Sequence, residues 1–418
     1  MLRLALRNIF RHKTRSLITL SAIAFGCVSL IFVGGFFEDI LFKMRESYIK
    51  AHTGHLQVYR KDFLTEGRRN PYAHLIEQPL ELTHIIQQEP GVTRVTQRLE
   101  FAGLFSTGET TMSCLGQGVE VRHEPVVRLS ETGTSRTDLP SMTGTVIEQG
   151  EPLAEDQPFG VIVGRGLAES LAVRPGDGLI LVSHTIGGSI NALDVIVRGI
   201  FYTSSQAFDD HYVRLPLSTA QRLLHTQSVQ ALVVFLERTE DTPRVRQELE
   251  RLIRARRLDV ELRTWDELSD FYTKTKAFFS RLFFVLKLVI AIIAILSIYN
   301  TMNMAVVERT TEIGTIMALG LKRRRVLWLF LCEGGLLGIL GGIAGLAAGT
   351  ALTWLVSQVG IPMPPPPGAT ITWHSEPLID PPTLAFAFGL SLATALISSW
   401  YPAQKASRLE IAEALRHS

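Results

Sequence analysis

The chain has 418 residues, of which 46% are hydrophobic and 20% charged, and its formal net charge is +2. It is too long for one simple domain and too apolar for an ordinary soluble protein, whereas the net charge by itself says nothing about partners. Cys114 is the only cysteine in the large polar segment, so no disulfide is expected there. His52, His55 and His74 show no metal-ligand spacing, and we expect them on the surface.

Residues 1–16 form a basic start without an acidic residue. Four apolar residues lie on one side of a helix drawn through this segment: Leu2, Leu6, Ile9 and Phe10. We expect an amphipathic helix on the cytoplasmic membrane surface. The next segment, 17–42, contains the uncharged run Leu17–Phe37, which is long enough to span the ~20 residues of a hydrocarbon core. A cleaved signal peptide is the alternative, but the run is too long for one and Phe36-Phe37-Glu38 is a poor cleavage site.

Residues 43–275 form a polar segment of domain size. Alternation, turn residues and helical periodicity predict the following elements: strands at Gly54–Val58, Val92–Ser106, Thr111–Val119, Leu179–Ser183, Leu193–Ile200, Gln230–Glu237 and Val260–Arg263, with a further strand near Val161, and helices at Glu77–Gln88, Gly166–Leu171, Pro216–Leu224 and Thr242–Arg256. Strand–helix–strand pieces at both ends with strands between them predict a large α+β domain, split by a β-rich insertion.

Three further spans are expected at 276–307, 326–357 and 382–402, with apolar cores Leu282–Val307, Leu327–Val356 and Thr383–Tyr401. The loop 358–381 has no Lys or Arg between Gln358 and Asp380, and the tail 403–418 is basic. The positive-inside rule then places both termini in the cytoplasm and residues 43–275 outside. The proline run Pro362–Pro367 must be extended. We expect a plain spacer there, with a rigid lid or partner ledge as the alternative.

The connection 308–325 between the second and third spans opens with acids and closes with a basic run. Ile313, Ile316, Met317 and Gly320 follow helical spacing and predict one face of a short amphipathic helix. Thr310 or Thr311 would cap its start and Gly320 would end it. Such a helix fits a socket on a partner protein. The alternative is an ordinary basic cytoplasmic loop.

The amino-acid sequence of this connection resembles a motif of a known family. The residues that carry the resemblance are Glu308, Arg309, Glu312, Ile313, Gly314, Ala318, Leu319 and Gly320. They are similar to the coupling helix of FtsX-like ABC-transporter permeases, the family that includes MacB and the lipoprotein-releasing LolC and LolE proteins. The closing string Tyr401–Arg416 resembles the end of the same family, and Gly54–Val58 resembles the opening of the LolC/LolE periplasmic domain. Met317 departs from the pattern, since the family often carries a basic residue there.

The third span carries two rows of glycines, which let another helix approach closely: Gly334, Gly338 and Gly342, and, offset from them, Gly341, Gly345 and Gly349. We expect these rows to pack within one subunit, because the resemblance implies that the first two spans form the subunit interface; a dimer role is the alternative.

Two charges, Lys287 and Glu333, lie inside spans. A difference of ~12 Å in depth argues against a direct pair. Lys287 would extend outward to the interface or line an outward cavity. Glu333 resembles a glutamate common in this span of the family, with a structural or a transmitting role.

The sequence contains no GxxxxGK[ST] phosphate loop, so ATP binding by that route is excluded and no cofactor is expected in this chain. The resemblance implies a non-catalytic permease subunit of the bacterial inner membrane. Its partners would be two copies of an ABC ATPase that binds ATP-Mg, a second permease subunit, membrane lipids, and a periplasmic carrier or adaptor, without nucleic acid. It implies mechanotransmission, with lipoprotein release first, MacB-like export of peptides or small molecules second, and FtsX-style activation of a cell-wall hydrolase as a different class.

Overall fold

The computed structural model describes residues 5, 7, 11, 13–67, 72–123, 126–128, 145–203, 205–364 and 373–410. The chain divides into two compact units. The helical unit comprises residues 1–41, 275–361 and 374–418, and the α/β unit comprises residues 42–274 and 362–373. The prolines at 365–367, which belong to the predicted stiff run, lie outside the described residues.

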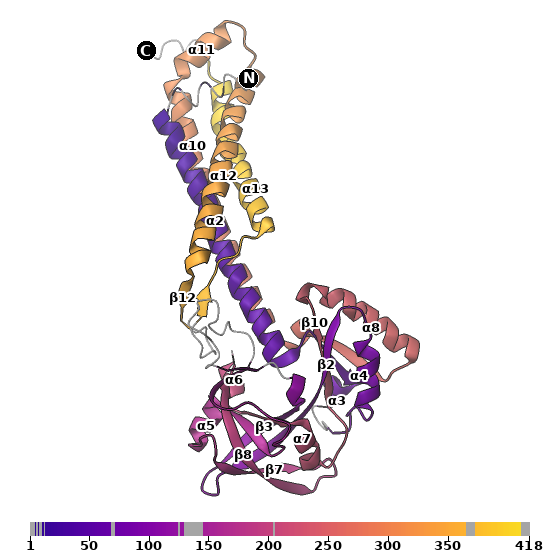
Figure 1. Cartoon of the computed structure of the whole chain (residues 1–418). Helices are drawn as coiled ribbons and strands as arrows, with labels where there is room; N and C mark the ends of the chain where they lie inside the picture. The colour runs from indigo at the N-terminus through magenta and orange to yellow at the C-terminus, as the bar shows by residue number, and fades with distance from the viewer. Residues whose placement is uncertain are drawn as a thin grey trace. The chain divides into compact units, whose positions relative to one another are not determined.

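Four helices in the described part of the chain are long and apolar enough to cross a membrane: α2 (Lys13–Tyr48), α10 (Asp270–Glu308), α12 (Arg323–Val359) and α13 (Pro381–Ser407). The short helix α11 (Thr310–Ala318) connects α10 to α12. The prediction of four apolar helices is confirmed. Helix α2 is longer than its apolar core. Its 36 residues extend ~54 Å at the usual rise per residue. Figure 1 shows α12 and α13 side by side.

One part of the α/β unit is an antiparallel sheet covered by helices. Its strands run in the order β11 (Val260–Thr264), β1 (Leu56–Arg60), β10 (Ala231–Leu236) and the first half of β2 (Val92–Ser106). The helices α4 (Pro79–Gln87) and α8 (Thr242–Arg256) lie against it (Figure 1). Leu82 and Ile86 of α4 and Val245 and Leu249 of α8 are buried with the inward residues of the strands. Alternation in the strands and the period of α8 account for this layer.

The other part of the α/β unit is a closed ring of strands. Starting from the second half of β2, the order is β3 (Thr111–Val119), β9 (Tyr212–Pro216), β6 (Gly160–Gly164), β8 (Ile190–Tyr202) and β7 (Gly178–His184). The ring closes because β7 pairs with both β2 and β8. Inward residues from these strands form one core with α5 (Arg165–Leu171) and α7 (Leu217–Leu224). The predicted β-rich insertion is therefore barrel-like.

The long strands β2 and β3 and helix α8 begin and end at the predicted residues. Several shorter elements were not predicted: η1 (Ile49–Thr53), α3 (Phe63–Glu66), η2 (Val121–His123), β4 (Val126–Arg128), β5 (Thr145–Gly150), α6 (Gln206–Asp209), β9, η4 (Thr239–Asp241), α9 (Trp265–Leu268), β12 (Ile361–Met363) and β13 (Trp373–Ser375). Each is too short for a clear periodic signal.

The sequence suggested that His55 lies on the surface. The structure shows that it is buried, with 6% of the residue exposed. Its Nδ1 accepts from the backbone N–H of Leu236 at 3.1 Å, and its Nε2 lies 3.1 Å from Thr239 Oγ1. The Thr239 hydroxyl donates to Glu46 at 2.8 Å. A neutral imidazole satisfies both contacts, because Nδ1 must stay unprotonated to accept. Burial lowers the pKa of His55 to about 4.

This lowered pKa makes the α/β unit sensitive to acid. An unfolded histidine has its pKa near 6.5, so below that pH the unfolded chain binds a proton that the folded chain refuses. The stability conferred by a neutral His55 is present above pH 6.5 and is lost as the pH falls from 6.5 to about 4. We expect a loss of about 3 kcal/mol across this window. The test is thermal unfolding of the full chain in detergent against pH. His55→Asn, which keeps an acceptor for the N–H, should show a shallower fall; an identical fall would contradict this account.

Candidate functional site at the α10–α12 connection

The connection between α10 and α12 is a short helix joined to α10 by one non-helical residue. Arg309, with φ −104° and ψ 14°, separates the two helices. The predicted threonine cap does not form, because the Thr310 hydroxyl donates back to Val306 and Val307 of α10 at 3.0 and 2.8 Å. Gly320 does end the turn, with a φ of +96° that a side chain would disfavour.

Helix α11 has an inner and an outer apolar face. Ile313 and Met317 are 5% and 7% exposed and pack with Val326 and Phe330 of α12. Ile316 and Leu319 are 41% and 83% exposed. The sequence analysis placed Ile313, Ile316 and Met317 on one docking face, and the structure divides them. The physical reason is that the ends of the neighbouring helices are themselves apolar and take up the Ile313 side.

Arg309 is the buried charge of this site, and the sequence analysis named it only as part of the motif. Its guanidinium donates to Glu333 of α12 at 3.2 Å and to Glu312 of α11 at 3.4 Å, and lies 5.5 Å from the centre of the Phe330 ring. The side chains of Arg309 and Glu333 are 9% and 10% exposed. Glu333 therefore has a structural partner on the connection.

Glu312 is also held within this chain. It accepts from Arg11 in the N-terminal segment at 3.1 Å as well as from Arg309. The geometry gives Glu312 an internal role, and its side chain remains 46% exposed. Glu308 is exposed at the end of α10.

Both glycine rows of α12 pack within this one chain. A Cβ added at Gly334, Gly338 or Gly342 would meet α13, at distances of 1.8 Å from Ser399, 2.7 Å from Ala395 and 2.6 Å from Ser391. A Cβ added at Gly341, Gly345 or Gly349 would meet α2, at 2.8 Å from Ile23, 2.5 Å from Cys27 and 2.8 Å from Ile31. Helix α12 is thus in backbone-close contact with two neighbours on two faces.

Lys287 of α10 lies between two aromatic rings. Its Nζ is 4.3 Å from the centre of the Phe283 ring and 4.3 Å from that of Phe386 on α13. A ring face attracts a cation, so these contacts support the charge within an apolar segment.

The loop before α13 is tied to α2. Asp39 is 1% exposed and accepts from the Ser375 hydroxyl and the Glu376 N–H, both at 2.9 Å. The Leu378 N–H donates to Gly35 at 3.0 Å. At its α13 end, the loop predicted as a plain spacer is therefore fastened to the first long helix.

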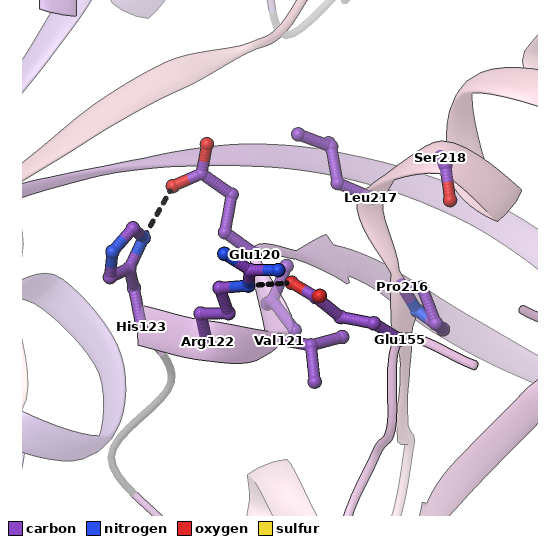
Figure 2. Close-up of a pocket in the computed structure, with 9 residues that line it drawn as sticks. Glu120, Val121, Arg122, His123, Glu155, Pro216, Leu217 and Ser218 are labelled. Carbon is purple, nitrogen blue, oxygen red and sulfur yellow. Dashed lines mark hydrogen bonds and ion pairs between the residues drawn. The ribbon is translucent and has the colours of Figure 1, made fainter. Parts of the chain in front are cut away.

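A pocket of about 430 Å³ lies in the α/β unit where β3 and β9 end beside α7 (Figure 2). Figure 2 shows its charged side chains paired with each other. Arg122 contacts Glu155 at 2.7 Å, and His123 contacts Glu120 at 3.2 Å. Because these charges are mutually satisfied and at least partly exposed, they do not define a preformed site for a ligand.

Comparisons with known proteins identify relatives of this chain. The model described as "MacB-like periplasmic core domain" matches residues 16–252, more than half of the chain, and the model described as "FtsX-like permease C-terminal" matches residues 284–411. The macrolide export ATP-binding/permease protein MacB of Syntrophobacter fumaroxidans is 31% identical over 38% of this chain and 20% of its own length. The lipoprotein-releasing system transmembrane protein LolC of Neisseria meningitidis is 24% identical over 67% of this chain and 72% of its own.

Among solved structures, the periplasmic region of MacB from Actinobacillus actinomycetemcomitans is 12% identical, covering 54% of this chain and 94% of that one, with a TM-score of 0.35. This chain spans only a fifth of the Syntrophobacter MacB that it matches. With both family models matched in chain order, the chain belongs to the MacB-like and FtsX-like family of ABC transporter permeases.

Proposed function

We propose that this chain is the permease subunit of a mechanotransmitting ABC transporter in the bacterial inner membrane. ATP hydrolysis by a separate ATPase would drive motion of the segment 43–275. Lipoprotein release is the first candidate for the process that this motion serves. The observation that carries the proposal is the two-faced helix α11. It buries Ile313 and Met317 against the bundle and leaves Ile316 and Leu319 exposed.

The orientation follows from charge. The N-terminal segment, the start of α12 and the end of α13 are basic. All three lie at the same side of a four-span bundle, because successive spans cross in opposite directions. The positive-inside rule places that side in the cytoplasm and the segment 43–275 in the periplasm. Both termini and α11 are then within reach of a cytoplasmic ATPase.

The sequence supports the assignment of ATP binding to a separate subunit. A phosphate loop needs a nest of backbone N–H groups and a lysine, and no such string occurs in these 418 residues. MacB of Syntrophobacter is named for both ATP binding and permease activity, and this chain matches a part of it. The ATP-Mg would be bound by two ATPase subunits, and the dimer would be completed by a second permease subunit.

Two observations bear on the cargo. Similarity to a lipoprotein-releasing LolC over 72% of that protein supports lipoprotein release. The match of residues 16–252 to a MacB-like core domain supports a second candidate, export of peptides or small molecules through a periplasmic adaptor.

Depletion of this chain in its host distinguishes the two. Lipoprotein release predicts that outer-membrane lipoproteins accumulate in the inner-membrane fraction, measured by density-gradient separation and immunoblotting. A control depletion complemented by the wild-type chain should restore sorting. Normal sorting after depletion, with retention of an exported peptide or small molecule inside the cell, would overturn the first assignment in favour of the second.

A further inference from the structure

Arg309 joins three elements at one point. It is the non-helical residue between α10 and α11, and its guanidinium contacts Glu312 of α11 and Glu333 of α12. The arginine is 8% exposed. A planar guanidinium with five N–H donors can hold two carboxylates at once, whereas a lysine offers a single charged point. The residue type therefore suits a junction between two helices.

Apolar side chains also join α11 to α12. Ile313 and Met317 pack against Val326 and Phe330. The free energy of hydrophobic contact is proportional to the apolar area that is buried, and it has no preferred direction. Such a contact therefore resists separation of the two helices more than it resists sliding of one along the other. The Arg309–Glu333 pair is directional and buried. Moving α11 along α12 would separate two charges in surroundings where their attraction is weakly screened.

Helix α12 is closely packed against two neighbouring helices. Its glycine rows place its backbone against α13 on one face and against α2 on another. Close packing of this kind has little slack, because side chains in a dense interior have no empty space into which to move.

We propose that Arg309 is a positioning residue that makes α11 and α12 move as one body, so that a push on α11 reaches the spans. This inference rests on the proposed function, in which an ATPase supplies the push. Arg309 itself need not contact the ATPase. This role differs from a purely structural one. A structural role would need only stable packing between α11 and α12, whereas coupling their motion needs the directional ion pair.

The test replaces the pair by apolar residues in the double variant R309L/E333L. Replacing both partners of a buried ion pair avoids an unpaired charge, so folding and packing should be retained. A bimane label at a cysteine replacing Val359, which is 58% exposed at the far end of α12, reports motion there. The three native cysteines are first replaced by alanine or serine. The full complex with its co-purified ATPase, in nanodiscs, is compared with ADP and with a non-hydrolysable ATP analogue.

The wild-type complex should show a nucleotide-dependent change in bimane emission. R309L/E333L should bind the ATPase normally but show at least a threefold smaller change. The control R323L, which removes an exposed arginine at the start of α12, should respond as the wild type does. A full response in R309L/E333L would overturn the proposal and leave the pair as a structural anchor. Absence of any response in the wild type would instead contradict the proposed function.

Discussion

Gly345→Leu should prevent α2 and α12 from packing and should reduce the yield of folded chain at least severalfold. Even a single Cβ at Gly345 would lie 2.5 Å from Cys27 Cβ and 3.0 Å from the Ala24 backbone. The backbone of α2 cannot move aside as a flexible side chain can. Overpacking of a dense interior costs about 1–3 kcal/mol or more. In lipid this loss matters, because helices associate through such close contacts rather than through hydrophobic burial.

The matched control is the same substitution at Gly389 of α13. A Cβ there would meet no described atom within 4 Å, so Gly389→Leu should fold with a wild-type yield and melting temperature. The measurement is size-exclusion recovery and thermal stability in detergent. Equal behaviour of the two leucine variants would show that the α2–α12 contact is not close-packed in the membrane.

Sequence patterns predicted the elements whose residues carry their own signal. The alternation of Val92–Ser106 and Thr111–Val119 set both strands at their observed ends, and Thr242–Arg256 was found from its helical period. The five-residue strand Tyr212–Pro216 was missed because it leads directly into α7. Closure of the ring by β7 depends on pairing between strands far apart in sequence, which no local pattern contains.

In the candidate site, too, local sequence patterns predicted some features and missed those that depend on distant contacts. The motif located α11, and the helical period selected Ile313, Ile316 and Met317. A period cannot say which side of a helix meets its neighbours, and the structure turns Ile313 and Met317 inward. Glu333 was noted as an intramembrane charge, but its partner is Arg309, 24 positions away. Comparing the depths of Lys287 and Glu333 along straight helices gave no indication of that partner, because Arg309 lies on the connection between helices.

We propose that an ATPase acts on α11 and that the exposed apolar side of this helix carries the contact. Ile316 and Leu319 project from α11 at 41% and 83% exposure, while Ile313 and Met317 hold the helix to the bundle. Removing one well-buried anchor from a protein interface costs roughly 2–4 kcal/mol, a 30-fold to 1000-fold loss of affinity. A carboxylate placed in an apolar groove adds the cost of burying an unpaired charge. Ile316→Asp should therefore release the ATPase without unfolding the chain.

Co-purification of the ATPase with Ile316→Asp, together with ATP turnover of the complex in nanodiscs, is the most direct test. The matched control is Arg246→Ala on α8, a residue paired with Glu250 and Glu267 in the α/β unit, which should leave association unchanged. We expect the Ile316→Asp variant to lose the ATPase while its melting temperature stays near that of the wild type. Normal association with normal turnover in Ile316→Asp would contradict the assignment of α11 as the coupling element.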